Sequence, residues 1–299
     1  PSPAARTIGD PCSWFAMLPA AQRSPTVANV LRAANEPPKR VHHGLLDATA
    51  SHEPAARSSI DDLVVDTVVH RMSLTPPPLA ATIAPLPGDP REALQRLART
   101  RCRFVQFSAA QPGMRPRELD AGARRGLRAR LRQLELEVSG IDLWIPTAHF
   151  DDTARVDRAV EALREAIILA ADLGRVPVSV LLPAEVDDAL RPAIEQLLTE
   201  AERRGVDLAD HAVTRRDVAL MNAHRLMVGI DPPGWIASSR DPVGAVLDTG
   251  HRLRSARLCD LTSAGMRAPV QAGSARSPHD DAQLDVSAYA IALAAIGYE

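Results

Sequence analysis

The sequence predicts an α/β fold, a (β/α) barrel of the TIM type, and three observations support this prediction. From Met72 onward, apolar runs typical of strands alternate with segments of helical period. About seven such units of roughly 30 residues each favour a barrel over an open sheet. No Gly-x-Gly-x-x-Gly motif follows a predicted strand, which argues against a sheet that binds a dinucleotide. We therefore expect a barrel over residues 72–299 that lacks its eighth strand, preceded by a poorly ordered extension over residues 1–71.

In the first half of the barrel, residues 79–86 form an apolar run that a Pro-Gly pair ends, and they predict the first strand. A helix over residues 91–99 follows, because Asp89 suits an N-cap and Pro90 suits the first helical position. The next predicted elements are a strand over 103–108, a helix over 120–134 and a strand over 136–145.

In the second half, the helix over residues 153–173 is the clearest of the chain. Its apolar residues recur at helical spacing, and they are Val156, Val160, Leu163, Ile167 and Leu173. Residues 176–182 are apolar nearly throughout, as is typical of a parallel strand covered on both faces. A helix over 186–204 ends at Gly205. The remaining predicted elements are strands over 206–213, 226–231 and 253–258 and helices over 242–247 and 288–296.

Composition argues against several classes of protein. The formal net charge of −2 gives no general attraction to nucleic acid or to an anionic membrane, so we expect neither partner. Three cysteines far apart fit neither a disulfide framework nor a zinc site, which favours a reducing compartment, the cytoplasm. The most apolar stretch, residues 166–182, is interrupted by Asp172, Arg175 and Pro177, so no membrane span is expected. Motifs of serine hydrolases and zinc proteases are also absent from the sequence.

Both ends of the chain carry expectations of their own. Residues 1–71 show no sustained strand or helix period, and Met72 is followed at once by the barrel pattern. One hypothesis is that Met72 is the native start. After the predicted helix over 288–296, the residues up to Glu299 do not predict a further strand. We expect a seven-stranded, incompletely closed barrel of reduced stability with weak or no metal binding.

Several strand-end motifs resemble a known family. They are Ser139-Gly-Ile-Asp-Leu-Trp-Ile-Pro146, His149-Phe-Asp-Asp, Ala170-Ala-Asp-Leu-Gly174, Val228-Gly-Ile-Asp231, Asp241-Pro-Val-Gly-Ala-Val and Ala256-Arg-Leu-Cys-Asp260. With the rhythm of residues 79–299, they resemble sugar phosphate isomerases and epimerases of the xylose-isomerase-like barrel superfamily. The resemblance implies a divalent metal, manganese, magnesium or zinc, at the carboxyl ends of the strands, held by two glutamates, an aspartate and a histidine.

This chain departs from the metal-binding pattern that the resemblance implies. His211, beside Asp210, stands where the fifth strand should end in glutamate. Asp231 matches the sixth strand, but Gly234 replaces the histidine three residues later. In the seventh strand the aspartate survives as Asp260, whereas both histidines are gone. At least half of the expected metal ligands are therefore absent or altered, so the cofactor is a divalent metal if the site is intact and otherwise none.

The candidate site consists of polar and aromatic residues at predicted strand ends, which should converge at one end of the barrel. We expect His211, Asp231 and Asp260 to be catalytic, with Asp231 and His211 as metal ligands. The expected substrate-binding residues are Gln106, Asp142, Trp144 and Arg257. Each has an alternative interpretation. Asp231 could cap a turn before two prolines, His211 could be a hydrogen-bonded structural histidine, Trp144 could be core or rim, and Arg257 could pair with Asp260 or Asp231.

Two functions follow from this site. The first is a sugar phosphate isomerase/epimerase-like protein that acts on a small sugar or sugar derivative at the barrel mouth. The alternative is a catalytically inactive barrel that binds a ligand or partner without metal chemistry. An apurinic endonuclease would need clustered histidines and a basic face, and the histidines of this chain are scattered. The oligomeric state is left open.

Overall fold

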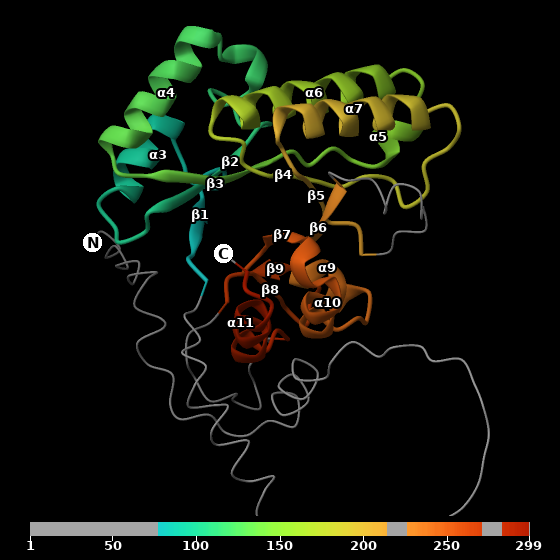
Figure 1. Cartoon of the computed structure of the whole chain (residues 1–299). Coiled ribbons are helices and arrows are strands. Elements are labelled where there is room, and N and C mark those ends of the chain that lie inside the picture. Colours follow the sequence, from blue (N-terminus) through green and yellow to red (C-terminus); the bar gives the residue numbers. More distant parts are fainter. Residues whose placement is uncertain (1–76, 214–225, 271–282, 299) are drawn as a thin grey trace, which may run out of the picture.

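The structure is a computed structural model, and it describes residues 77–213, 226–270 and 283–298. In these residues seven parallel strands form one curled sheet in chain order, and helices lie around it (Figure 1). The strands are β1 (Ala80–Thr82), β2 (Phe104–Ser108), β3 (Glu137–Asp142), β4 (Val178–Val180), β5 (Leu208–Asp210), β6 (Leu226–Ile230) and β7 (Leu253–Ala256). The predicted fold, a TIM-type (β/α) barrel with seven strands, is confirmed.

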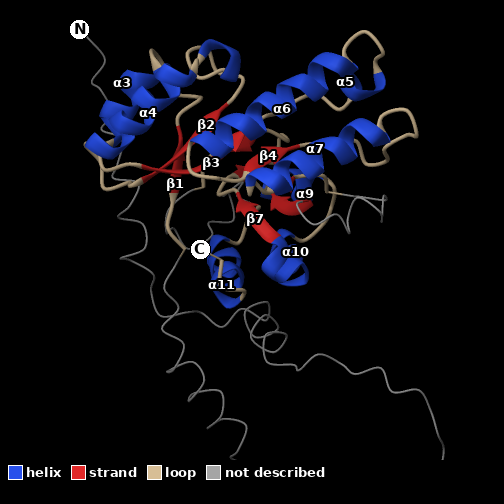
Figure 2. Ribbon diagram, turned by 45° about the horizontal axis from the view of Figure 1, so that its top comes forward, coloured by secondary structure: helices blue, strands red, loops and turns tan. Residues whose placement is uncertain are grey.

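Helices follow most strands, as Figure 2 shows in blue around the red sheet. The longer ones are α3 (Pro90–Leu97), α4 (Ala121–Gln133), α6 (Val156–Asp172), α7 (Arg191–Arg204), α10 (Pro242–Thr249) and α11 (Val286–Ala295). Four of them begin after an aspartate whose side chain accepts a backbone N–H of the first turn, which stabilises the helix start. These aspartates are Asp89, Asp120, Asp241 and Asp285.

Several elements differ in extent from the prediction. The first strand covers Ala80–Thr82 rather than residues 79–86, because two prolines follow closely. Helix α7 begins at Arg191 rather than at residue 186, since Pro192 suits the first turn. The predicted C-terminal stop at Gly205 is confirmed, with a left-handed φ of 72°.

Shorter elements lie in the connections, and the sequence had not predicted them. They are η2 (Pro116–Glu118), α5 (Ala148–Asp151), α9 (Pro232–Ala237), η3 (Gly250–Arg252) and a two-stranded antiparallel hairpin of β8 (Asp260–Leu261) and β9 (Arg267–Ala268). The hairpin follows the end of β7, so it lies near the carboxyl ends of the strands.

The barrel is open between β1 and β7, which are the two edge strands of the described sheet. Two side chains replace part of the missing pairing. The Ala256 backbone N–H at the β7 edge donates to the Tyr298 hydroxyl at 3.0 Å. Arg257, directly after β7, donates to the Thr82 hydroxyl on β1 at 3.5 Å. The Arg257 side chain therefore links the two edges, and the Tyr298 hydroxyl satisfies one backbone N–H of β7, where a closed barrel would have another strand.

Two apolar cores support the sheet. The larger one packs α3, α4, α6 and α7 against β1 to β5, with Phe107, Ile141 and Ile167 fully buried. The smaller one packs α10 and α11 against β6 and β7 around Tyr289, which is 1% exposed. The barrel therefore consists of a large first part and a small second part.

The expectations for the amino-terminal part of the chain concern residues that the structure does not describe. The segment 1–71, the hypothesis that Met72 is the native start and the boundary at residue 72 all lie outside the described residues. Within the described ranges, no helix combines the length and the apolar character that crossing a bilayer requires.

Candidate binding site at the barrel mouth

Polar side chains gather at the carboxyl ends of the strands, which form one face because the strands are parallel. Asp142 ends β3, His211 follows β5 directly, and Asp231 follows β6 directly. All three side chains are buried, with exposed fractions of 3%, 4% and 6%. We call this face the barrel mouth.

A first cluster links β7 to the opposite side of the sheet. The Arg257 guanidinium donates to the carboxylate of Asp142 and, at 2.9 Å, to the Gln106 side-chain oxygen on β2. The Gln106 amide in turn donates to Asp142 at 2.9 Å. We call Arg257 and Asp142 the buried pair, because their side chains are 13% and 4% exposed. Burial lowers the pKa of Arg257 to about 10, so it remains charged at neutral pH.

A second cluster joins the hairpin to the end of β6. Arg267 on β9 donates through both terminal nitrogens to the Asp231 carboxylate, with 2.7 Å between Nη1 and Oδ1. The Cys259 thiol also donates to Asp231 at 3.3 Å. We call Arg267 and Asp231 the hairpin pair, in which the arginine side chain is 62% exposed and the aspartate 8%. Burial, followed by Asp231, raises the pKa of Cys259 to about 12, so this thiol is protonated at neutral pH.

His211 lies between the two clusters with neither ring nitrogen hydrogen-bonded. Its ring lies directly over Gly229 of β6, so closely that a Cβ on Gly229 would overlap it. Burial lowers the pKa of His211 to about 4, against a smaller opposing effect of Asp231, and the imidazole is neutral at pH 7. The site thus holds a neutral imidazole in a place that only a glycine on β6 permits.

Trp144 is the exposed aromatic residue of the mouth, with 41% of its surface accessible. Its ring lies 5.6 Å from the Arg257 guanidinium carbon, within the range of a cation–π contact. It also meets the His211 ring edge-on, with 5.1 Å between the ring centroids. Two buried polar residues therefore hold an exposed aromatic surface in place.

Asp260 makes a different kind of contact. One of its carboxylate oxygens accepts the backbone N–H groups of Leu261, Gln283 and Leu284, at 2.7 to 3.1 Å. These bonds tie the hairpin to the segment before α11, so Asp260 holds the chain that carries Arg267.

The structure also settles several alternatives from the sequence. Arg257 pairs with Asp142, so the alternative interpretation, a pairing with Asp260 or Asp231, is wrong. The interpretation of His211 as a hydrogen-bonded histidine is wrong, because its ring nitrogens have no partner. Asp231 is the N-cap residue of α9, but its side chain makes no capping hydrogen bond there.

Some residues of the mouth were missed by sequence reasoning. Arg267 carries no signal of its own, because the short hairpin that positions it has no strong pattern in the sequence. Gly229 could have been found, since an isolated glycine inside a strand indicates close approach of another group. Ser179 and Ser255 hydrogen-bond across the barrel interior at 3.0 Å, and only the curl of the sheet brings them together.

The residues of the mouth do not fit the divalent metal that the resemblance implies. Asp142 and Asp231 both accept hydrogen bonds from guanidinium groups, which would repel a cation. Among the described residues, no group of three or more His, Cys, Asp or Glu side chains could hold a metal ion. Two arginines thus neutralise the carboxylates that a metal would need.

Solved structures of low sequence identity share this fold. A xylose isomerase domain protein from Planctomyces limnophilus superposes with a TM-score of 0.57 and 19% identity over 75% of this chain and 87% of that one. A D-allulose 3-epimerase from Methylomonas sp., in complex with D-allulose, gives 0.53 and 16% over 74% and 80%. An L-ribulose 3-epimerase gives 0.53 and 21% over 74% and 78%.

Comparison of sequences adds one partial match and one family. The porphobilinogen deaminase of Roseiflexus castenholzii is 29% identical over 157 residues, 52% of this chain. The matched part spans 47% of the length of that curated relative. A family model described as xylose isomerase-like TIM barrel matches residues 94–271, which include β2 to β7 and the hairpin. This chain belongs to the xylose isomerase-like TIM barrel family.

Proposed function

We propose that this chain is a sugar isomerase/epimerase-like protein that binds a small sugar or sugar derivative at the barrel mouth without metal chemistry. The observation that carries the proposal is the exposed Trp144 ring, held between the buried side chains of Arg257 and His211. Binding sites for small ligands combine an aromatic surface with a few well-placed polar groups. The apolar C–H face of a sugar ring suits the tryptophan surface.

Each mouth residue has a role in this proposal. Trp144 packs against the sugar ring, and Arg257 supplies hydrogen-bond donors to its hydroxyl or acidic groups. Gln106 and Asp142 position Arg257. His211 is a buried, neutral group whose ring supports the Trp144 ring from the side.

The absence of metal chemistry in the proposal rests on charge. Metal-dependent isomerisation needs free carboxylates, both to hold the metal and to take a proton from carbon. Asp142 and Asp231 are instead bound to Arg257 and Arg267. The relatives named as epimerases support a sugar as the class of ligand, since one of them is described in complex with D-allulose.

Tryptophan fluorescence tests the proposal. In a variant with Trp14→Phe and Trp235→Phe, Trp144 is the sole tryptophan of the chain and reports on the mouth. Titration with ketoses, aldoses and their phosphates should change its emission, with equal affinity after chelator treatment and in added Mn²⁺. The variant Trp144→Ala, followed by calorimetry, should lose at least about tenfold in affinity. Trp235→Phe is the matched control and should bind like the parent chain.

An isotope experiment separates binding from turnover. In D₂O, an epimerase or isomerase exchanges a carbon-bound proton of its sugar for deuterium, which NMR detects. We expect binding without exchange. Exchange that requires Mn²⁺ would contradict the metal-free proposal, and a failure of every sugar to bind would contradict the choice of ligand.

A further inference from the structure

The outer face of α3 and α4 carries positive charge that the net charge of the chain conceals. Residues 89–137, described without a gap, contain 12 arginines and 6 acidic residues. Residues 151–207, around α6 and α7, contain 7 arginines and 13 acidic residues. The balance of the whole chain, −2, therefore combines two oppositely charged sides.

Most of this positive charge is free to meet a partner. Seven exposed arginines of residues 89–137 make neither an ion pair nor a side-chain hydrogen bond with another described residue, and they are Arg91, Arg99, Arg101, Arg117, Arg125, Arg128 and Arg132. We call these seven residues the basic face. The nearby carboxylates are mostly engaged. Asp89 and Asp120 cap helices, while Glu118 and Glu137 pair with arginines outside the basic face.

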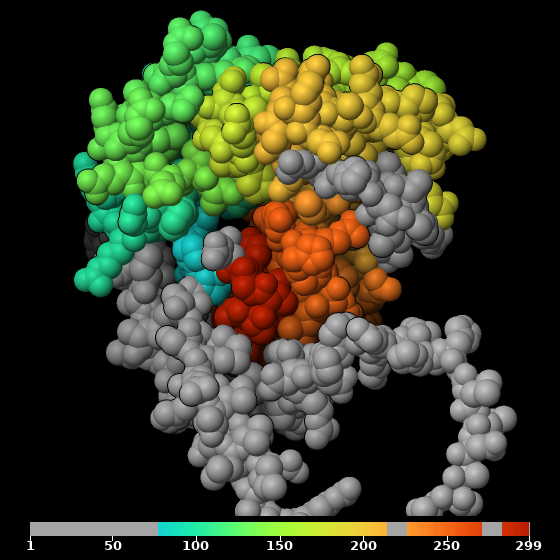
Figure 3. All heavy atoms as spheres, viewed as in Figure 1, coloured from blue at the N-terminus to red at the C-terminus, as the bar shows by residue number. Residues whose placement is uncertain are grey.

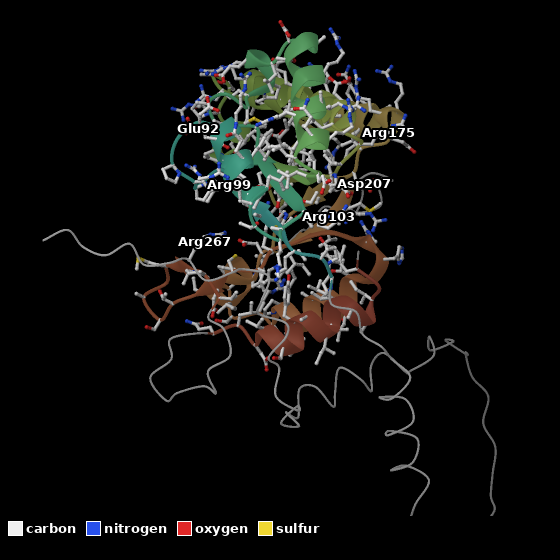
Figure 4. All side chains as sticks on the ribbon, turned by 90° about the vertical axis from the view of Figure 1, so that its left-hand side faces the viewer. Glu92, Arg99, Arg103, Arg175, Asp207 and Arg267 are labelled. Carbon is white, nitrogen blue, oxygen red and sulfur yellow. The ribbon has the colours of Figure 1, made fainter. Side chains whose placement is uncertain are left out.

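The geometry of α4 arranges part of the basic face in a row. Arg125, Arg128 and Arg132 are exposed and recur at helical spacing, whereas Leu127 and Leu131 are buried against the sheet. Seven residues of helix span about 10 Å, so three guanidinium groups follow one another along one side of α4. Figure 3 shows α3 and α4 as a continuous blue-green and green surface. Figure 4 views this side directly and labels Arg99 of the basic face on it, together with Glu92 of α3.

We infer that the basic face binds the phosphate backbone of a double-stranded nucleic acid. Duplex DNA carries about one negative charge per 1.7 Å of its axis, which matches a row of closely spaced arginines. Single strands are bound by stacking on aromatic rings, but the two aromatic residues of 89–137, Phe104 and Phe107, are not exposed. Membrane-surface helices insert large apolar side chains, and those exposed in the described residues, Leu86, Trp144, Leu258 and Met266, lie outside α3 and α4.

Fluorescence anisotropy of a labelled duplex of mixed sequence, as DNA and as RNA, tests the inference on the full chain. Affinity should fall linearly with the logarithm of salt concentration between about 50 mM and about 200 mM. In R125Q/R128Q/R132Q, affinity at about 100 mM salt should fall at least about tenfold. The slope should decrease by about 0.9 for each phosphate contact that is lost.

A charge-matched variant controls for total charge. R155Q/R158Q/R203Q removes three exposed arginines on the α6 and α7 side and should bind duplex within about twofold of the parent chain. Equal losses in both variants, or no duplex binding by the parent chain at about 50 mM salt, would overturn the inference. Binding to anionic vesicles alone, or full displacement of the duplex by polyglutamate at equal charge, would overturn it in favour of a membrane or an acidic protein.

Discussion

The buried pair and the hairpin pair have the same chemistry and different surroundings. Each joins an arginine that follows β7 in the chain to an aspartate at the end of another strand. The arginine of the buried pair is 13% exposed and its pKa is lowered, because burial dominates. The arginine of the hairpin pair is 62% exposed and its pKa is raised, because its hydrogen bonds to Asp231 dominate.

This difference has a consequence for stability and for function. The buried pair joins β7 to β1, β2 and β3 across an open barrel, so its loss affects the large and small parts of the molecule together. The hairpin pair joins one short hairpin to one strand end. We therefore expect the loss of the buried pair to destabilise the whole barrel, and the loss of the hairpin pair to have only a small effect on stability.

Substitution of the buried pair should have the largest effect. Arg257→Ala leaves the Asp142 carboxylate buried without a counter-charge, which should lower the free energy of unfolding by about 3–5 kcal/mol. Urea denaturation measures this change. The double variant Arg257→Met with Asp142→Leu removes both charges and should recover most of the loss. A loss below about 1 kcal/mol in Arg257→Ala would show that the pair does not hold the barrel together.

Disturbing the packing of His211 on Gly229 should have an intermediate effect on stability. Gly229→Ala places a methyl group where the His211 ring lies and should lower the free energy of unfolding by up to about 3 kcal/mol. Combination with His211→Ala should remove part of this penalty. Gly126→Ala on α4 is the control, because open space surrounds that position and alanine favours helix, so it should stabilise by up to about 1 kcal/mol. Equal losses at both glycines would contradict the packing of His211 on Gly229.

The neutral state of His211 should make stability depend on pH. Its pKa in the folded state, about 4, lies below the value of about 6.5 in the unfolded chain. The folded state therefore binds fewer protons, and the stabilisation is complete above pH 6.5 and lost as the pH falls toward 4. Between about pH 7 and pH 5 the loss should be about 2 kcal/mol. The variant His211→Phe should lack this part of the pH dependence when the free energy of unfolding is measured at several pH values. The same pH dependence in this variant would contradict the assignment to His211.

Removal of the exposed arginine should have the smallest effect. Arg267→Ala leaves Asp231 with the Cys259 thiol as a donor, and the lost arginine is largely in solvent. We expect a loss of about 1 kcal/mol or less in urea denaturation, which decreases in high salt. A loss as large as that of Arg257→Ala would remove the distinction between the two pairs.

Local signals in the sequence were sufficient for the order of elements. The apolar period of α6, the N-cap at Asp89 and the stop at Gly205 depend on neighbours within a few residues, and the structure confirms all three. The alternation that they form also determined the barrel and its strand order. Element ends were less accurate, as with the first strand, because prolines nearby and tertiary pairing decide where a strand stops.

The partners of the charged residues were decided only by tertiary structure. Arg257 and Asp142 are separated by 115 residues, and Arg267 and Asp231 by 36. The sequence placed Arg257, Asp142 and Asp231 at strand ends, since strand boundaries are local. It could not state which carboxylate each arginine would reach, because that depends on how far the sheet curls and on a hairpin whose two strands have two residues each. The sequence alone therefore predicted which charged residues lie at the strand ends. That arginines neutralise the aspartates among them was decided by the folded barrel.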